Sequence, residues 1–151
     1  MQNINSTWLI PIIIIAGALQ AWGPPINGAL NKAIINPWLA SLISFLPIVC
    51  LLFCLLLCLP SPLPSLESIY NMPWWAPLGG LVGAFAVVAG LLFVNRIGAG
   101  TFAGLTITAN LLMSLLIDKY GWFGIQVHEL SIGRIMGGAL MIIGITLISK
   151  Y

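Results

Sequence analysis

Five apolar runs, each about the length of a membrane crossing, alternate with short polar segments along the chain. A helix of ~20 apolar residues spans the ~30 Å hydrocarbon core of a bilayer, so each run predicts one transmembrane helix. The predicted crossings cover residues 8–30, 38–59, 75–94, 97–117 and 132–149. The longest links, 60–73 and 118–131, are too short for a separate soluble domain. We therefore expect an all-α integral membrane protein that forms a single membrane domain over residues 1–151.

Charged and aromatic side chains support these boundaries. The charged residues all fall at or near the ends of the apolar runs. Rings that favour the headgroup region lie at the same ends; they are Trp8, Trp38, Trp74, Trp75, Trp122 and Tyr151. Arg134 lies two residues inside the fifth run, and we expect its side chain to extend back to the interface.

Composition excludes a soluble domain. The chain is 60% hydrophobic and 5% charged, with a mean hydropathy of +1.10, which is typical of a protein embedded in lipid. The first run predicts a retained crossing because the leader at residues 1–7 has no basic residue, unlike a cleaved signal peptide. The chain is expected to lie in a lipid bilayer, and nothing in it predicts a nucleic-acid partner.

Three cysteines, Cys50, Cys54 and Cys58, recur at a spacing of four inside the second crossing. An odd count within lipid argues against a disulfide framework, so they are expected to act as small hydrophobes. A metal site would need further ligands on a neighbouring helix, and the single histidine, His128, lies in a loop. We expect no metal and no cofactor.

The first crossing contains residues that interrupt a helix. Pro24 and Pro25 have no backbone N–H, so they leave the carbonyls of Gln20 and of the next residue without their intrahelical donors. Proline also disfavours helical backbone in the residue before it, which here is Gly23 for the first proline. We predict local unwinding and a hinge at Gly23, Pro24 and Pro25. Gln20 and Asn27 share one face and would line a cavity. In the alternative interpretation, the break is a packed kink and these amides only join helices.

The fourth crossing has a matching polar stripe. Thr106, Asn110 and Ser114 recur every four residues, and Asp118 follows at the end of the run. Such a stripe can face a substrate, but the hydroxyls can equally bond to their own helix and the amide can bridge two helices. Asp118 is expected to lie at the interface beside Lys119.

We predict a substrate site near the midplane, where the amides of the first crossing meet the stripe of the fourth. No catalytic residue is predicted. The substrate-binding residues predicted are Gln20, Asn27, Asn110 and Ser114, with Trp75 at the mouth of the cavity.

Small residues predict packing faces on two crossings. Gly79, Gly83 and Gly90 recur at helical spacing in the third, and Gly133 and Gly137 recur in the fifth. Such spacing allows two helix backbones to approach closely, either within the chain or across a dimer interface.

Basic residues are almost evenly divided between the two sides of the membrane. Lys32, Arg96 and Lys150 would lie on one side, and Lys119 and Arg134 on the other. Because an excess of basic residues sets orientation, this balance predicts that the chain inserts both ways. Two opposed copies would form an inverted homodimer. Alternatively, weaker signals fix one orientation.

The order of short motifs resembles the YdcZ family of five-helix proteins in the drug/metabolite transporter superfamily. The motifs are "GALQ", "NGAL", "ASLISF", "WWAPLGGLVGAF", "RIGAGT" and "ANLLMSLLIDKYG", and the resemblance covers nearly the whole chain. It implies a bundle of drug/metabolite transporter type and a subunit of a bacterial inner-membrane transporter. Relatives of this kind occur as dual-topology single proteins or as pairs of oppositely oriented paralogues. Family patterns often have glutamine at the position of Asn110.

The resemblance extends to the small multidrug resistance proteins, which carry a carboxylate in the middle of the first helix. This chain has the neutral Gln20 at a similar depth. An amide both donates and accepts hydrogen bonds, so it suits a neutral, zwitterionic or polyhydroxylated substrate. We expect a small-molecule transporter that works by alternating access. An accessory or assembly protein and a channel are the alternatives. The chain has no constellation for an enzyme.

Overall fold

The fold is that of a computed structural model, which describes residues 9–59 and 62–151. Within these ranges every regular element is a helix, and five helical segments are long and apolar enough to cross a membrane. They are Leu9–Ile34, Pro37–Cys58, Ala76–Ile97, Ala99–Tyr120 and Ile132–Lys150. The all-α membrane fold with five crossings is thus confirmed, with ends that differ from the predicted ones by a few residues. The predicted start at Trp8 lies outside the described residues.

The chain divides into two compact units, Met1–Asn95 and Arg96–Tyr151. The first unit contains α1 (Leu9–Gln20), α2 (Gly23–Ile34), α3 (Pro37–Cys58), the short α4 (Leu66–Tyr70), η2 (Ala76–Leu78) and most of α5 (Gly79–Ile97). The second contains α6 (Ala99–Tyr120), η3 (Trp122–Gly124) and α7 (Ile132–Lys150). A single membrane domain over residues 1–151 stays a prediction.

The turn between α2 and α3 is short because each helix ends or begins with a strong local signal. Ile35 has left-handed backbone (φ 62°) and donates its N–H to the carbonyl of Asn31, which ends α2. Asn36 then caps α3, because its side-chain oxygen accepts from the N–H groups of Trp38 and Leu39 at 3.1 Å. Pro37 occupies the first turn of α3, where its missing N–H has no helical partner to lose.

The buried core of the first unit lies where α2, α3 and α5 meet. Ala40 of α3 and Leu91 of α5 are completely buried, and Gly28 of α2 and Gly90 of α5 are buried as well. Small residues at these positions let the helix backbones approach closely. No described residue of α1 is buried.

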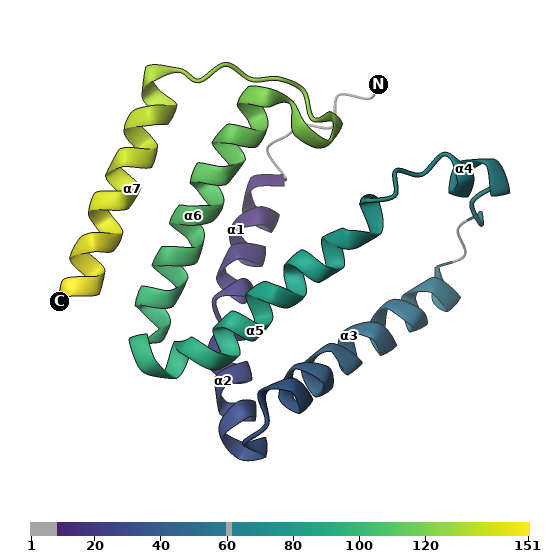
Figure 1. Ribbon diagram of the computed structural model, residues 1–151, viewed down its shortest axis with the longest axis horizontal. Coiled ribbons are helices and arrows are strands. Elements are labelled where there is room, and N and C mark those ends of the chain that lie inside the picture. The colour runs from purple at the N-terminus through teal and green to yellow at the C-terminus, as the bar shows by residue number, and fades with distance from the viewer. Residues whose placement is uncertain (1–8, 60–61) are drawn as a thin grey trace. The chain divides into compact units, whose positions relative to one another are not determined.

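The second unit is an antiparallel helical hairpin, in which α6 and α7 lie side by side (Figure 1). Gly121 ends α6 in left-handed conformation (φ 64°), and Ser131 caps α7 by accepting from the N–H of Arg134 at 3.3 Å. Gly104 of α6 packs directly against Ile145 of α7, where an added Cβ would collide with the isoleucine side chain. The hairpin is therefore held by a close contact that a larger residue would disturb.

Candidate functional site

The first crossing is interrupted just before Gly23, Pro24 and Pro25, the predicted hinge residues. α1 ends at Gln20, two turn residues follow, and α2 begins at Gly23 (Figure 1). The N–H groups of Ala21 and Trp22 reach back only three residues, to the carbonyls of Ala18 and Leu19 at 3.2 and 3.1 Å. Trp22 keeps right-handed helical backbone (φ −77°, ψ −26°), and Gly23, Pro24 and Pro25 lie in the first turn of α2. A hinge at these three residues stays a prediction.

The interruption packs against α5. A Cβ added to Gly90 would lie 3.1 Å from Pro24 Cβ and 3.4 Å from Pro24 Cα, so a larger residue would have to push the proline away by a few tenths of an ångström. Gly90 is one of the predicted packing glycines, and its neighbour is the first proline of the interruption. Gly90 thus allows the first turn of α2 to pack closely on α5.

Three amides join α2 to its neighbours. Asn27 accepts a hydrogen bond from the Ser44 hydroxyl of α3 at 2.7 Å. Asn31 of α2 donates to the Leu91 carbonyl of α5 at 3.2 Å, and Asn95 of α5 donates back to the carbonyl of Gly28 at 3.1 Å. This geometry matches the alternative in which amides join helices, although it leaves the Asn27 amide nitrogen without an acceptor among the described residues.

Gln20 has a different environment. Its side chain is exposed at the end of α1 and forms no hydrogen bond within the described part of the first unit. Its own carbonyl cannot receive a hydrogen bond from Pro24, which has no N–H. The end of α1 therefore combines an exposed amide with a carbonyl that has lost its helical donor.

Polar residues of α6 divide into two kinds. The Thr106 hydroxyl donates within its own helix, to the carbonyls of Phe102 and Ala103 at 2.9 and 3.0 Å. Asn110 and Ser114, in contrast, are exposed. Thr106 is thus satisfied locally, whereas Asn110 and Ser114 keep side-chain groups that can meet a ligand.

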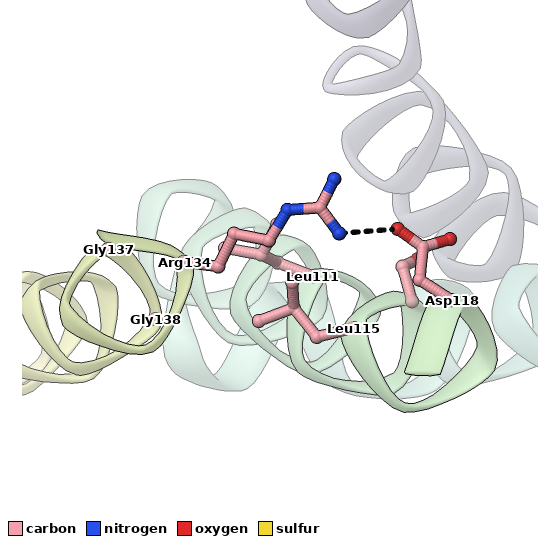
Figure 2. A pocket seen from close by; sticks show the side chains of 7 residues that line it. Leu111, Leu115, Asp118, Arg134, Gly137 and Gly138 are labelled. Carbon is pink, nitrogen blue, oxygen red and sulfur yellow. Dashed lines mark hydrogen bonds and ion pairs between the residues drawn. The ribbon is translucent and has the colours of Figure 1, made fainter. Parts of the chain in front are cut away.

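Ser114 lines a pocket of about 350 Å³ between α6 and α7 (Figure 2). The other lining residues are Leu111, Leu115, Asp118, Arg134, Gly137 and Gly138. Arg134 Nη1 donates to Asp118 Oδ2 across the two helices at 3.3 Å. The pocket thus has a serine hydroxyl and two opposite charges along an otherwise apolar wall.

Sequence reasoning placed Asp118 beside Lys119 and extended Arg134 to the interface, and it missed their pairing. A signal was present, because consecutive crossings joined by a short link form an antiparallel hairpin. Asp118, near the end of one helix, and Arg134, at the start of the next, then lie at the same end of that hairpin. The loop adds a further contact at this end, from the backbone N–H of His128 to the carbonyl of Asp118 at 2.9 Å.

The structure gives the element to which each remaining predicted residue belongs, but it does not test the predicted substrate site or the predicted packing of four glycines. Gln20, Asn27 and Trp75 belong to the first unit, whereas Asn110 and Ser114 belong to the second, so the site that would join them stays a prediction. A Cβ on Gly79, Gly83 or Gly137 would meet nothing within 4 Å, and one on Gly133 would meet only the Ser131 hydroxyl, at 3.9 Å. Their role in packing also stays a prediction.

Close approach of helices also occurs at glycines that the repeat pattern did not single out. A Cβ on Gly28 would lie 2.7 Å from Val94 Cγ1, and one on Gly138 would lie 3.2 Å from Leu112 Cδ2. Gly138 directly follows Gly137, which lines the pocket. One glycine of this pair therefore packs on α6, and the other leaves space beside it.

Comparison with known families agrees with the resemblance seen in the sequence. The family model described as "Putative inner membrane exporter, YdcZ" matches residues 8–147. This family is part of the drug/metabolite transporter-like group. No solved structure matches the chain. With five membrane-spanning helices and a match over nearly its full length, the chain belongs to the YdcZ family of multi-pass inner-membrane proteins.

Proposed function

We propose that the chain is one subunit of a small-molecule exporter that works by alternating access. The observation that carries this proposal is the interrupted first crossing, with an exposed Gln20 amide at the end of α1. Transporters bind their substrates at such discontinuous helices, where backbone groups without helical partners face a cavity. The family description supplies the direction, export.

The interruption separates a fixed half-helix from a half-helix with few attachments. α2 is tied to α3 and α5 through the amides of Asn27, Asn31 and Asn95. No residue of α1 is buried, so it has little packing to lose when it moves. Gly23, Pro24 and Pro25 begin the fixed half, where Pro24 packs against Gly90 of α5, and they border the proposed hinge. Movement of α1 about residues 21–22 would open and close the cavity.

The proposed substrate site includes residues of both units. In this proposal Gln20 and the amide nitrogen of Asn27 would face Asn110 and Ser114 of α6, and Trp75 would lie at the mouth. Support comes from the exposure of Gln20, Asn110 and Ser114, each of which retains hydrogen-bonding capacity at its side chain. Because the predicted site contains no charged side chain, it suits a neutral, zwitterionic or polyhydroxylated molecule.

The proposed assembly is a homodimer of two oppositely oriented copies. The near balance of basic residues, with Lys32, Arg96 and Lys150 against Lys119 and Arg134, supports insertion in both directions. An antiparallel pair supplies the inverted symmetry that alternating access uses. An oppositely oriented paralogue could take the place of one copy.

The test is binding and flux in purified protein. A thermal-shift screen identifies a ligand, and flux of that ligand is then measured in proteoliposomes. The variants Gln20→Leu and Asn110→Leu keep bulk but remove hydrogen bonding, so each should weaken binding by about tenfold to a hundredfold. Gln126→Leu, in the loop before α7, is the matched control and should bind like the parent.

Other outcomes would assign the chain to another class. Flux that does not saturate with ligand concentration indicates a channel. A stable complex with an unrelated membrane protein, together with no flux in vesicles, indicates an accessory protein. If both leucine variants fold and bind ligand like the parent, the polar residues only join helices.

A further inference from the structure

The ion pair between α6 and α7 is loose. Its single contact, from Arg134 Nη1 to Asp118 Oδ2, is 3.3 Å long, whereas charge-assisted hydrogen bonds of this type are typically ~2.7–2.9 Å. The two side chains are 37% and 31% exposed. In Figure 2 the rest of the guanidinium points away from the carboxylate, which leaves donors for a second partner. Both charged side chains are thus accessible to a ligand that reaches this end of the hairpin.

The position of Arg134 at the start of α7 makes a nearby anion electrostatically favourable. It lies in the first turn of α7, directly after Ile132 and Gly133, and that turn contains no acidic residue. The N-terminal end of a helix carries partial positive charge, so a cation there is unfavourable unless an anion is close. Asp118 supplies one such contact, through one of its two oxygens.

The pocket next to the pair has room for a small molecule. Its volume of about 350 Å³ lies at the lower end of the range for ligand pockets. Leu111 and Leu115 make its wall apolar, and Gly137 leaves it open because a Cβ there would meet nothing within 4 Å. Figure 2 shows these side chains beside the ion pair. A ligand that fits would have charged groups at one end and a short apolar part.

We propose that this pocket binds a zwitterionic small molecule of amino-acid type. Its carboxylate pairs with Arg134, its ammonium group pairs with Asp118, and its apolar part contacts Leu111 and Leu115. An anion alone would face the carboxylate of Asp118, and a cation alone would face the guanidinium, whereas a zwitterion satisfies both charges. This inference rests on the proposed exporter function. It names the class of substrate that the exporter binds in the pocket at the end of the α6–α7 hairpin.

The test compares three probes that differ by one charged group. Free leucine is the zwitterion, isocaproate is leucine without its amino group, and isopentylamine is leucine without its carboxylate. Glycine and phenylalanine extend the series in size. Binding to the purified full-length protein is measured by titration calorimetry. We expect at least one amino acid of the series to bind, and isocaproate and isopentylamine to bind at least about tenfold more weakly than leucine.

Variants assign the binding to this pocket. Arg134→Gln and Asp118→Asn retain size and remove one charge each, and either should lower amino-acid affinity by about tenfold to a hundredfold. Lys119→Gln removes a neighbouring charge that does not line the pocket and should leave affinity unchanged. If Arg134→Gln does not fold, Asp118→Asn assigns the binding.

Three results would overturn the inference: no amino acid binds, the three matched probes bind equally, or folded Arg134→Gln and Asp118→Asn bind like the parent. Flux in proteoliposomes separates this inference from the exporter proposal. Flux of a different solute, with no amino-acid binding, leaves the exporter proposal intact and rejects this pocket. Amino-acid binding that depends on Arg134, without flux of any ligand, supports the pocket and rejects the exporter.

Discussion

Replacing Gly28 by alanine should loosen the packing of α2 on α5. The added Cβ would lie 2.7 Å from Asn95 Nδ2 and 2.7 Å from Val94 Cγ1, well inside the 3.5–4.0 Å at which carbon atoms are in contact. The helices must separate, and the hydrogen bond from Asn95 to the Gly28 carbonyl, now 3.1 Å, is lengthened or lost.

The cost of Gly28→Ala can be estimated term by term. Overpacking a well-packed site costs about 1–3 kcal/mol, and the loss of one hydrogen bond between membrane helices costs about 0.6 kcal/mol. Alanine has a higher helix propensity than glycine, which stabilises the folded protein by about 1 kcal/mol. The free energy of unfolding should therefore fall by about 0.6–2.6 kcal/mol.

Reversible unfolding in mixed micelles, titrated with SDS and followed by circular dichroism, measures this loss. Gly83→Ala is the matched control, because it makes the same substitution on α5 where a Cβ would meet nothing within 4 Å. It should be neutral or stabilise by up to about 1 kcal/mol. A Gly28→Ala protein as stable as Gly83→Ala would refute the close approach of α2 and α5.

Three further predictions concern the hinge, the orientation and the ion pair. Replacing both Pro24 and Pro25 by alanine should raise stability by up to about 1 kcal/mol per restored hydrogen bond and slow flux; unchanged flux in a more stable protein would reject the hinge. Reporters fused after Tyr151 should be active on both sides of the membrane, and two added lysines there should bias this end inward; a one-sided reporter signal would reject the antiparallel homodimer. Asp118→Asn should change the free energy of unfolding by no more than about 1 kcal/mol, because the pair is partly exposed; a larger loss in SDS titration would show that the pair holds the hairpin together.

The length and apolarity of each run were enough to predict the five crossings. That the first crossing is interrupted near its prolines was also predictable, because the missing N–H of Pro24 is a local property, but the break lies at residues 21–22 rather than at Gly23, Pro24 and Pro25. Partners between helices were not predictable in the same way. Nothing in the periodicity of the first crossing indicates that Asn27 meets Ser44, since the facing residue depends on how two helices cross.

The sequence also did not predict which glycines would pack against another helix. Repeats of small residues singled out Gly79 and Gly83, where a Cβ would meet nothing, whereas Gly28 and Gly104 pack against side chains of other helices. A repeat identifies a smooth helix face but does not say what lies opposite. The ion pair of Asp118 was within reach of prediction, because hairpin geometry alone brings it to the same end as the start of the next helix.

For the proposed homodimer, symmetry constrains how export can be driven. Two identical copies in opposite orientation present the same structure to each side of the membrane, so the hairpin end with Arg134 and Asp118 would occur once at each face. Such a dimer has no intrinsic direction, and its binding affinities at the two faces are equal. Net export then requires a concentration gradient of the substrate or a coupled ion. The resemblance to the small multidrug resistance proteins puts Gln20 at a depth similar to that of their proton-binding carboxylate. On that expectation the predicted midplane site has no titratable group for proton coupling, and the substrate gradient itself is the simplest driving force.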